Sequence, residues 1–246
     1  MSDYTGGYYD NLDATSLRSA RRVVPRVMDL VRPARVVDVG CGRGGWLRVF
    51  LEHGVTEILG VDGDWVDPAG LHIPRERFQQ RDLRQTLEIA GTFDLAVSLE
   101  VAEHLPAAQA DGFVDGLTRL APVVLFSAAI PHQGGVGHVN EQWPEYWAER
   151  FARHGYLPVD VLRRELWDDP GVAWWYSQNI LLFSREPRLA EMAGPTPRLV
   201  HPRHYLIKME ALRNRSEPER MSLRTLLAQA PQVLRHALGR RLRRRG

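Results

Sequence analysis

Four side chains that could bind a metal ion or move a proton lie within a short stretch of this sequence. Glu100, Glu103 and His104 have i, i+3, i+4 spacing, which would bring them to one face of a helical turn. His138 lies in a later glycine-rich segment, residues 131–143, that could move over a ligand. Two carboxylates and two imidazoles suit Mg²⁺, Mn²⁺ or Zn²⁺. Such an ion would lower the pKa of a bound hydroxyl group and orient it for attack.

The alternative without a metal is a histidine general base. Imidazole titrates near physiological pH, so His138 or His104 could take a proton from a hydroxyl group. His138 is preferred over His132 because the residues after it begin a predicted helix, which would fix its position. A purely structural role for either ring stays open at this point.

A glycine-rich loop follows the first apolar run. Gly40, Gly42 and Gly45 lie where a strand should end and a helix begin. Glycines there permit positive φ and let a ligand approach the backbone closely. Taken alone, the spacing also fits a dinucleotide-binding loop, with Asp62 placed to bind a ribose diol.

Three acidic residues around the loop favour a different ligand. Asp38 precedes the loop, Asp62 ends the second predicted strand, and Asp82 follows the third. A pyrophosphate is stabilised by a helix N-terminus but not by nearby carboxylates. The sulfonium and ammonium groups of S-adenosylmethionine are cations, and nearby carboxylates stabilise them. The acidic ring therefore favours a cationic cofactor.

These motifs resemble those of the class I S-adenosylmethionine-dependent methyltransferases. Residues 38–44, 61–64 and 81–83 are similar to the first three motifs of that family, and residues 93–106 to its fourth strand and following helix. The resemblance covers roughly residues 35–184. It implies a Rossmann-like fold and transfer of a methyl group from S-adenosylmethionine.

The resemblance also implies how each residue would bind this cofactor. Gly40 and Gly42 would face its amino-acid part, and Asp62 would bind the ribose hydroxyls. Asp82, with the Leu83 backbone beside it, would accept from the adenine amine. The complete predicted set is Asp38, Gly40, Cys41, Gly42, Asp62, Gly63, Asp82, Leu83 and Leu99.

The Glu-x-x-Glu-His pattern is similar to that of two metal-using branches, the small-RNA 3′-terminal 2′-O-methyltransferases and the ubiquinone-pathway O-methyltransferases. In the RNA branch a later histidine completes the site, and it corresponds here to His138. The implied metal ligands are Glu100, Glu103, His104 and His138. The same pattern occurs in family members that use no metal, and no RNA-binding domain is visible here.

The predicted elements that must position these residues alternate between strands and helices. Strands are predicted at residues 35–40, 57–62, 77–82, 93–100 and 123–130. Helices are predicted at Ser16–Val31, Trp46–His53, Ala107–Leu120 and Trp143–His154, with a kink or restart at Pro25. This alternation predicts a parallel sheet with right-handed crossovers.

Two later strands change the pattern. Residues 156–163 and 178–184 are predicted to form an antiparallel edge hairpin joined by a loop without a helix. The fold class is therefore α/β, with a Rossmann-like, seven-stranded, mostly parallel sheet and an antiparallel terminal hairpin. The predicted domains are a helical cap at 1–33, a methyltransferase domain at 34–185, and an extended arm with a basic helical tail at 186–246.

Composition excludes several other classes of protein. The single cysteine, Cys41, excludes an intramolecular disulfide and a cysteine-only zinc site. No apolar run reaches the roughly 20 residues needed to span a bilayer. The polar N-terminus does not follow the order of a signal peptide, so we expect a cytoplasmic protein.

Charge is concentrated at the C-terminus. The net charge is +2, and residues 239–246 contain five arginines, so the remainder of the chain is slightly acidic. A slightly acidic body argues against a nucleic-acid partner. The basic tail could contact an anionic membrane surface, and the arm at residues 199–206 could pack on a second subunit to form a homodimer.

Aromatic residues gather near the predicted site. Trp174 and Trp175 are candidates for a lid that stacks on a sugar or aromatic ring, whereas Trp147 and Phe151 are expected in the core. The predicted function is O-methylation of a small-molecule or glycan hydroxyl, with help from Mg²⁺ or another divalent metal as an option. The alternatives are an RNA 3′-terminal 2′-O-methyltransferase and a non-catalytic cofactor-binding protein.

Overall fold

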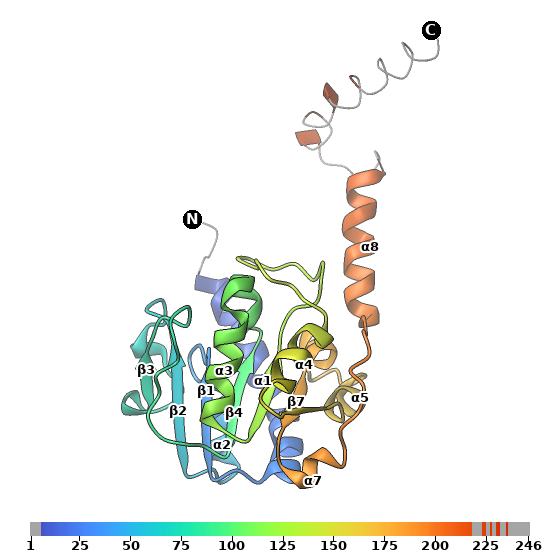
Figure 1. Cartoon of the computed structure of the whole chain (residues 1–246). Helices are drawn as coiled ribbons and strands as arrows, with labels where there is room; N and C mark the ends of the chain where they lie inside the picture. Colours follow the sequence, from blue (N-terminus) through green and yellow to red (C-terminus); the bar gives the residue numbers. More distant parts are fainter. Residues whose placement is uncertain (1–5, 218–222, 225–226, 228–229, 232–234, 236–246) are drawn as a thin grey trace. The chain divides into compact units, whose positions relative to one another are not determined.

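The computed structural model describes residues 6–217, 223–224, 227, 230–231 and 235. Within the compact unit Met1–His201 the strands form one seven-stranded sheet in the order β3-β2-β1-β4-β5-β7-β6 (Figure 1). The strands are β1 (Arg35–Val39), β2 (Glu57–Asp62), β3 (Phe78–Gln80), β4 (Leu95–Leu99), β5 (Val123–Ser127), β6 (Leu157–Val159) and β7 (Leu181–Ser184). β7 runs antiparallel to both of its neighbours, β5 and β6, and the other strand pairs of this sheet are parallel. The predicted fold class is confirmed.

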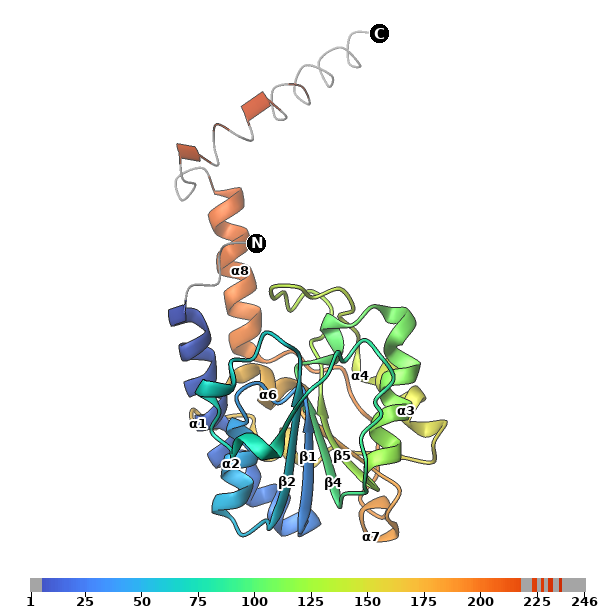
Figure 2. The same cartoon turned by 90° about the vertical axis from the view of Figure 1, so that its left-hand side faces the viewer.

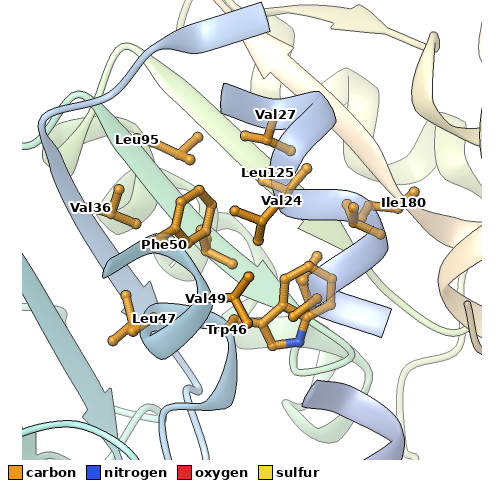
Figure 3. Packing of buried hydrophobic residues seen from close by; sticks show 14 of the residues in the cluster. Val24, Val27, Val36, Trp46, Leu47, Val49, Phe50, Leu95, Leu125 and Ile180 are labelled. Atoms are coloured by element: carbon orange, nitrogen blue, oxygen red, sulfur yellow. The ribbon is translucent and has the colours of Figure 1, made fainter. Parts of the chain in front are cut away.

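Helices cover both faces of the sheet (Figure 2). One face carries α1 (Gly6–Val31), α2 (Gly45–Glu52), α5 (Leu162–Leu166) and α6 (Trp174–Asn179), and the other carries α3 (Ala110–Leu120) and α4 (Pro144–Ala152). In Figure 3, Val24 and Val27 of α1 and Phe50 of α2 pack beside Val36 and Leu95 of the sheet. Burial of an apolar side chain of this size contributes roughly 1.5–3 kcal/mol.

The first helix differs from its prediction. It begins at Gly6 rather than Ser16 and continues through Pro25 without a restart. Proline removes one intrahelical hydrogen bond. Val23, Val24 and Val27 are fully buried around this position, so packing of the helix against the sheet offsets the loss.

The connection between β6 and β7 also differs from its prediction. It contains α5 and α6 instead of a helix-free loop, although the two strands pair antiparallel as expected. Helices of five and six residues are too short to produce a periodic pattern in the sequence. Buried Leu162, Leu166 and Tyr176 hold them in place through tertiary packing.

The predicted extended arm contains one short helix, α7 (Pro187–Ala190). Further along, it is attached to the α5–α6 region by partly buried hydrogen bonds. Arg163 pairs with Asp160 and donates to the carbonyl oxygens of Gln178 at 3.3 Å and Pro197 at 3.2 Å. The backbone N–H of His201 donates to the side chain of Gln178 at 3.0 Å.

The second compact unit, Pro202–Gly246, begins with helix α8 (Pro202–Ser216), as predicted. The arginine-rich segment 239–246 lies outside the described residues, and so does the membrane contact predicted for it. Domain boundaries at residues 33 and 185 stay a prediction. Among the described residues, no helix combines the length and apolar character needed to cross a membrane.

Candidate functional site

The glycine loop and the Glu100–His104 segment meet at the point where the order of the strands reverses. They follow β1 and β4, which are neighbours in the sheet. Ligands of open α/β sheets bind at such a point, beyond the carboxyl ends of the strands. A Cβ atom added to Gly40 would lie 2.3 Å from a methyl group of Val101, so the loop packs directly against the second segment.

The loop backbone adopts conformations that favour glycine. Gly40 has φ +89° and Gly42 has φ +54°, both in the left-handed region. A Cβ atom added to Gly42 would meet nothing within 4 Å, so this residue faces open space. The predicted cofactor-facing role of Gly42 is consistent with that exposed backbone.

Asp62 links the glycine loop to the end of β2. Its carboxylate accepts the backbone N–H groups of Gly42 and Gly63, each at 2.6 Å. Each carboxylate oxygen has a second lone pair, so the group can still accept from ligand hydroxyls. Trp65, which the sequence analysis missed, is 65% exposed and donates a further hydrogen bond to Asp62. The feature of the sequence that could have indicated it is an aromatic residue three positions after Asp62, the acidic residue that ends β2.

Two buried carboxylates and a thiol share this part of the site. Asp38 is 2% exposed and Asp62 is 5% exposed. Burial, and secondarily the charge of Asp62, raise the pKa of Asp38 well above its ordinary value. Burial, then the charges of Asp38 and Asp62, also raise the pKa of the Cys41 thiol. The sulfonium and ammonium groups of S-adenosylmethionine are cations that would offset this charge, so the residues fit the predicted cofactor.

We expect Asp38→Asn to stabilise the cofactor-free protein at neutral pH. A carboxyl group whose pKa is raised by folding contributes stability below its unfolded pKa, and that stability is lost as pH rises through the folded pKa. The wild-type protein should therefore lose stability between acidic and neutral pH as Asp38 ionises. The variant has no carboxyl group at this position and should not lose this contribution to the free energy of unfolding. Near pH 7 the variant should be more stable by roughly 1–3 kcal/mol, the range for a desolvated polar group.

Thermal unfolding followed by circular dichroism between pH 4.5 and 8 would measure this difference. This range lies above the ordinary aspartate pKa of about 3.9. Asp29→Asn, an exposed aspartate on α1, is the matched control and should show no such trend. A variant that is less stable than wild type by the same amount at every pH would contradict the expectation.

The other predicted cofactor residues are placed as follows. Asp82 is half-exposed, and its carboxylate already accepts from the Arg84 guanidinium at 2.8 Å. The side-chain hydrogen bond from Arg84 lowers the pKa of Asp82. Leu83 and Leu99 are buried, Leu99 at the end of β4. The adenine-binding role of Asp82 stays a prediction and would make the adenine amine an additional donor to this carboxylate.

Three of the four predicted metal ligands lie together. Potential ligand atoms of Glu103, His104 and His138 are all within 4.8 Å of one another. The two imidazole rings meet edge to face, with centroids 4.8 Å apart. His104 is exposed, yet desolvation of its ring and then the neighbouring His138 lower its pKa. Neutral imidazole is the form that binds a metal or accepts a proton.

Glu103 is fully buried at the centre of this group. Its Oε1 accepts from the Ala129 backbone at 3.2 Å, and its Oε2 has no hydrogen-bond partner among the described residues. Burial, and then the charge of Glu100, raise the pKa of Glu103 well above its ordinary value. A buried, unpartnered carboxylate oxygen beside two imidazoles fits a divalent cation by its donor chemistry.

Glu100 lies outside this three-residue group, and its conformation corrects the prediction of a shared helical face. It has φ +55°, and the helical turn begins after it, at Ala102–His104. The backbone N–H of Glu100 donates to the carbonyl oxygen of Ser127 on neighbouring β5 at 3.0 Å, which ties Glu100 to the end of the strand pair rather than to the helical turn. Its carboxylate accepts from Gln133 at 2.9 Å and Asn179 at 3.0 Å. Burial raises the pKa of Glu100.

Glu141 is a further site residue that the sequence analysis missed. Its carboxylate accepts the backbone N–H groups of His132 at 2.8 Å and Gly134 at 2.5 Å, and it lies 2.9 Å from Nδ1 of His138. Although burial acts to raise it, hydrogen bonds from His138 and the two backbone groups lower the pKa of Glu141 below its ordinary value. Spacing of three residues from His138 was the available signal.

The predicted aromatic residues divide between core and surface. Trp147 and Phe151 are buried, as expected. Trp174 and Trp175 are half-buried and belong to α6 rather than to a loop. Their role as a lid stays a prediction.

Comparison with known sequences identifies a common domain. Residues 13–169, more than half of the chain, match the family model described as a methyltransferase domain. A ribosomal RNA large subunit methyltransferase E from Granulibacter bethesdensis is 29% identical over 141 residues, or 54% of this chain and 61% of that protein. The corresponding protein of Caulobacter sp. is 56% identical over 41 residues, or 16% of this chain and 18% of that protein. The chain thus matches less than two thirds of the length of these relatives.

Solved structures share the fold at low sequence identity. Magnesium protoporphyrin IX methyltransferase from Synechocystis, with bound S-adenosylhomocysteine, aligns with a TM-score of 0.54 and 16% identity over 70% of this chain and 84% of that chain. The methyltransferase domain of bacterial CtHen1 aligns with a TM-score of 0.50 and 21% identity over 68% of this chain and 97% of that chain. Both likenesses concern the fold.

Proposed function

Since the chain belongs to the class I S-adenosylmethionine-dependent methyltransferases, we propose that it methylates a hydroxyl oxygen of a small molecule or glycan. The group of Glu103, His104 and His138 carries this proposal. It adjoins the glycine loop through the contact between Gly40 and Val101. This adjacency supports a role for the group in acting on an acceptor next to the cofactor.

The chemistry of the group suits an oxygen acceptor. S-Adenosylmethionine, when bound, supplies an electrophilic methyl group attached to a positively charged sulfur. A hydroxyl oxygen is a weak nucleophile until its proton is removed. His138 or His104 accepts that proton as the oxygen bonds to the methyl carbon and the bond from that carbon to sulfur breaks.

A divalent metal is the second part of the proposal. Glu103, His104 and His138 would hold Mg²⁺ or Mn²⁺, with Glu100 as a fourth ligand if its two amide partners shift. The unpartnered Oε2 of Glu103 supports this option. The ion would lower the pKa of the acceptor hydroxyl and orient it.

Calorimetric titration of Mn²⁺ into chelator-treated protein saturated with S-adenosylhomocysteine would test the metal. We expect Glu103→Gln, which keeps the side-chain volume, to weaken Mn²⁺ binding at least tenfold, or about 1.4 kcal/mol. Glu149→Gln on the exposed side of α4 is the control and should bind as wild type does. Absence of Mn²⁺ binding to the wild-type protein would contradict the proposed metal site, and the histidine general base would then be the preferred mechanism.

A panel of catechol and monosaccharide acceptors would test the function itself. Radiolabelled methyl transfer from S-adenosylmethionine should appear with at least one acceptor, and mass spectrometry should place the methyl group on oxygen. Methylation of amines or carboxylates alone would contradict the proposal.

RNA is the second candidate acceptor. The names of the curated relatives favour it, since several are ribosomal RNA methyltransferases. The slightly acidic charge of residues 1–238 argues against it. Methyl transfer to the 3′-terminal 2′-hydroxyl of a short RNA, with strongly salt-dependent binding, would replace the small-molecule proposal. If neither small-molecule hydroxyl groups nor RNA are methylated, the alternative of a non-catalytic cofactor-binding protein gains support. Membership of a methyltransferase family argues against that alternative.

Cytoplasmic location, homodimer formation through the arm and contact of the basic tail with a membrane surface remain proposals of ours. Sedimentation and vesicle-binding measurements on the full chain would address the last two.

A further inference from the structure

Glu141 brings together the two parts of the loop that carries His138. It accepts the backbone N–H groups of His132 and Gly134 and lies against the His138 ring at 2.9 Å. Both backbone groups can only donate, and two donors converging on one carboxyl group favour its ionised, acceptor form. The loop conformation, with φ +68° at His132 and +69° at Gly134, is therefore fixed around a single carboxylate.

The same contact determines which nitrogen of His138 carries hydrogen. An ionised carboxylate has no proton to donate, so Nδ1 must be the donor to Glu141. In a neutral imidazole the remaining nitrogen, Nε2, then has the lone pair. Carboxylate–histidine pairs of this kind fix the orientation and the tautomer of the ring.

Gly135 lies directly against the Nε2 edge of the His138 ring. A Cβ atom added at Gly135 would lie 2.2 Å from Nε2 of His138, closer than two such atoms can come. Gly135 does not have a positive φ, so alanine there would act through this contact rather than through backbone strain. The ring can therefore occupy this position only because residue 135 has no side chain.

We propose that Glu141 is a positioning residue that holds His138 as the Nδ1–H tautomer, and that the absence of a side chain at Gly135 gives the ring the room to take this position. The inference deepens the proposed function and rests on it for the identity of the reaction. The hydrogen-bond assignment itself can be tested without any acceptor.

Long-range ¹H–¹⁵N correlation spectra of the full, chelator-treated chain with ¹⁵N-labelled histidine would measure the tautomer. His138→Asn identifies the signals of His138 by their loss. We expect the Nδ1–H form in wild-type protein and in the control Glu149→Gln, and a mixture with the Nε2–H form in Glu141→Ala. An Nε2–H form in the wild type, or no change in Glu141→Ala, would overturn the proposal.

Gly135→Ala gives an independent test that leaves Glu141 intact. It should displace the ring of His138 and lower kcat roughly 10–100-fold, the range for loss of such supporting interactions. Its affinity for S-adenosylhomocysteine should not change. Gly194→Ala is the matched control, because nothing lies within 4 Å of its added Cβ atom. Wild-type kcat in Gly135→Ala would refute the role of Gly135.

The activity assays and the tautomer spectra test the proposed function and the positioning role of Glu141 separately. If no catechol, sugar or RNA hydroxyl is methylated, the proposed function fails, and the tautomer spectra still decide whether Glu141 positions His138. If hydroxyl methylation occurs but the tautomer does not depend on Glu141, only the positioning role fails.

Discussion

His138→Ala should lower kcat for the best acceptor of the catechol and sugar panel roughly 10²–10⁴-fold, the range for loss of a general base. The ring lies with Glu103 and His104 in the group whose ligand atoms are within 4.8 Å of one another. Its ring contacts Glu141 and His104 rather than the glycine loop, so affinity for S-adenosylhomocysteine should stay within about twofold. Steady-state rates and calorimetry would measure the two effects separately.

His132→Ala is the matched control for this experiment. His132 is an exposed histidine of the same loop, and only its backbone N–H contacts Glu141. Added imidazole should restore part of the rate of His138→Ala if the ring acts as a base, and should not restore it if the ring is needed to bind a metal. A fully active His138→Ala variant would remove this residue from both roles.

Asp62→Asn should weaken binding of S-adenosylhomocysteine roughly 10–150-fold. The substitution replaces one acceptor oxygen with an NH₂ group that faces the N–H of Gly42 or Gly63, both of which now donate to the carboxylate at 2.6 Å. It also weakens the predicted acceptor for the ribose hydroxyls. Loss of a charged hydrogen bond costs about 1.5–3 kcal/mol, which gives the quoted range.

Calorimetry across a pH series would test the charge of Asp62 as well as its position. Burial raises the pKa of Asp62, and the ionised form is the stronger acceptor. Wild-type affinity should therefore fall as pH decreases through that raised pKa, at a higher pH than an ordinary aspartate would require. Asp64→Asn, an exposed neighbour, should retain wild-type affinity. Unchanged affinity in Asp62→Asn would refute the ribose-binding assignment.

Local patterns were sufficient to predict the sheet and the glycine loop. Strands such as β4 and β5 are continuous apolar runs, and all their residues are buried, which is the pattern of a parallel strand covered on both faces. The glycine loop was predictable because positive φ at Gly40 and Gly42 restricts the residue type. Both features depend on a few adjacent residues.

The site depends in addition on contacts between distant segments, which no local pattern reports. The Glu103–His104 pair was predicted together with His138 through the family resemblance. Gln133 and Asn179, which bind Glu100, come from different segments and are polar residues without periodic spacing. Glu100 itself was predicted in a helical turn because spacing alone does not reveal its bond to Ser127 on a neighbouring strand.

The partly buried hydrogen bonds between Arg163 and Pro197 and between His201 and Gln178 affect how the protein can be shortened. A chain truncated after Arg185 would remove the Pro197 carbonyl and the His201 N–H. Arg163, 1% exposed, would lose an acceptor, and Gln178, fully buried, would lose a donor. Loss of each of these hydrogen bonds lowers the stability of the protein by about 0.5–1.5 kcal/mol. Expression of a shorter fragment should therefore extend at least through His201.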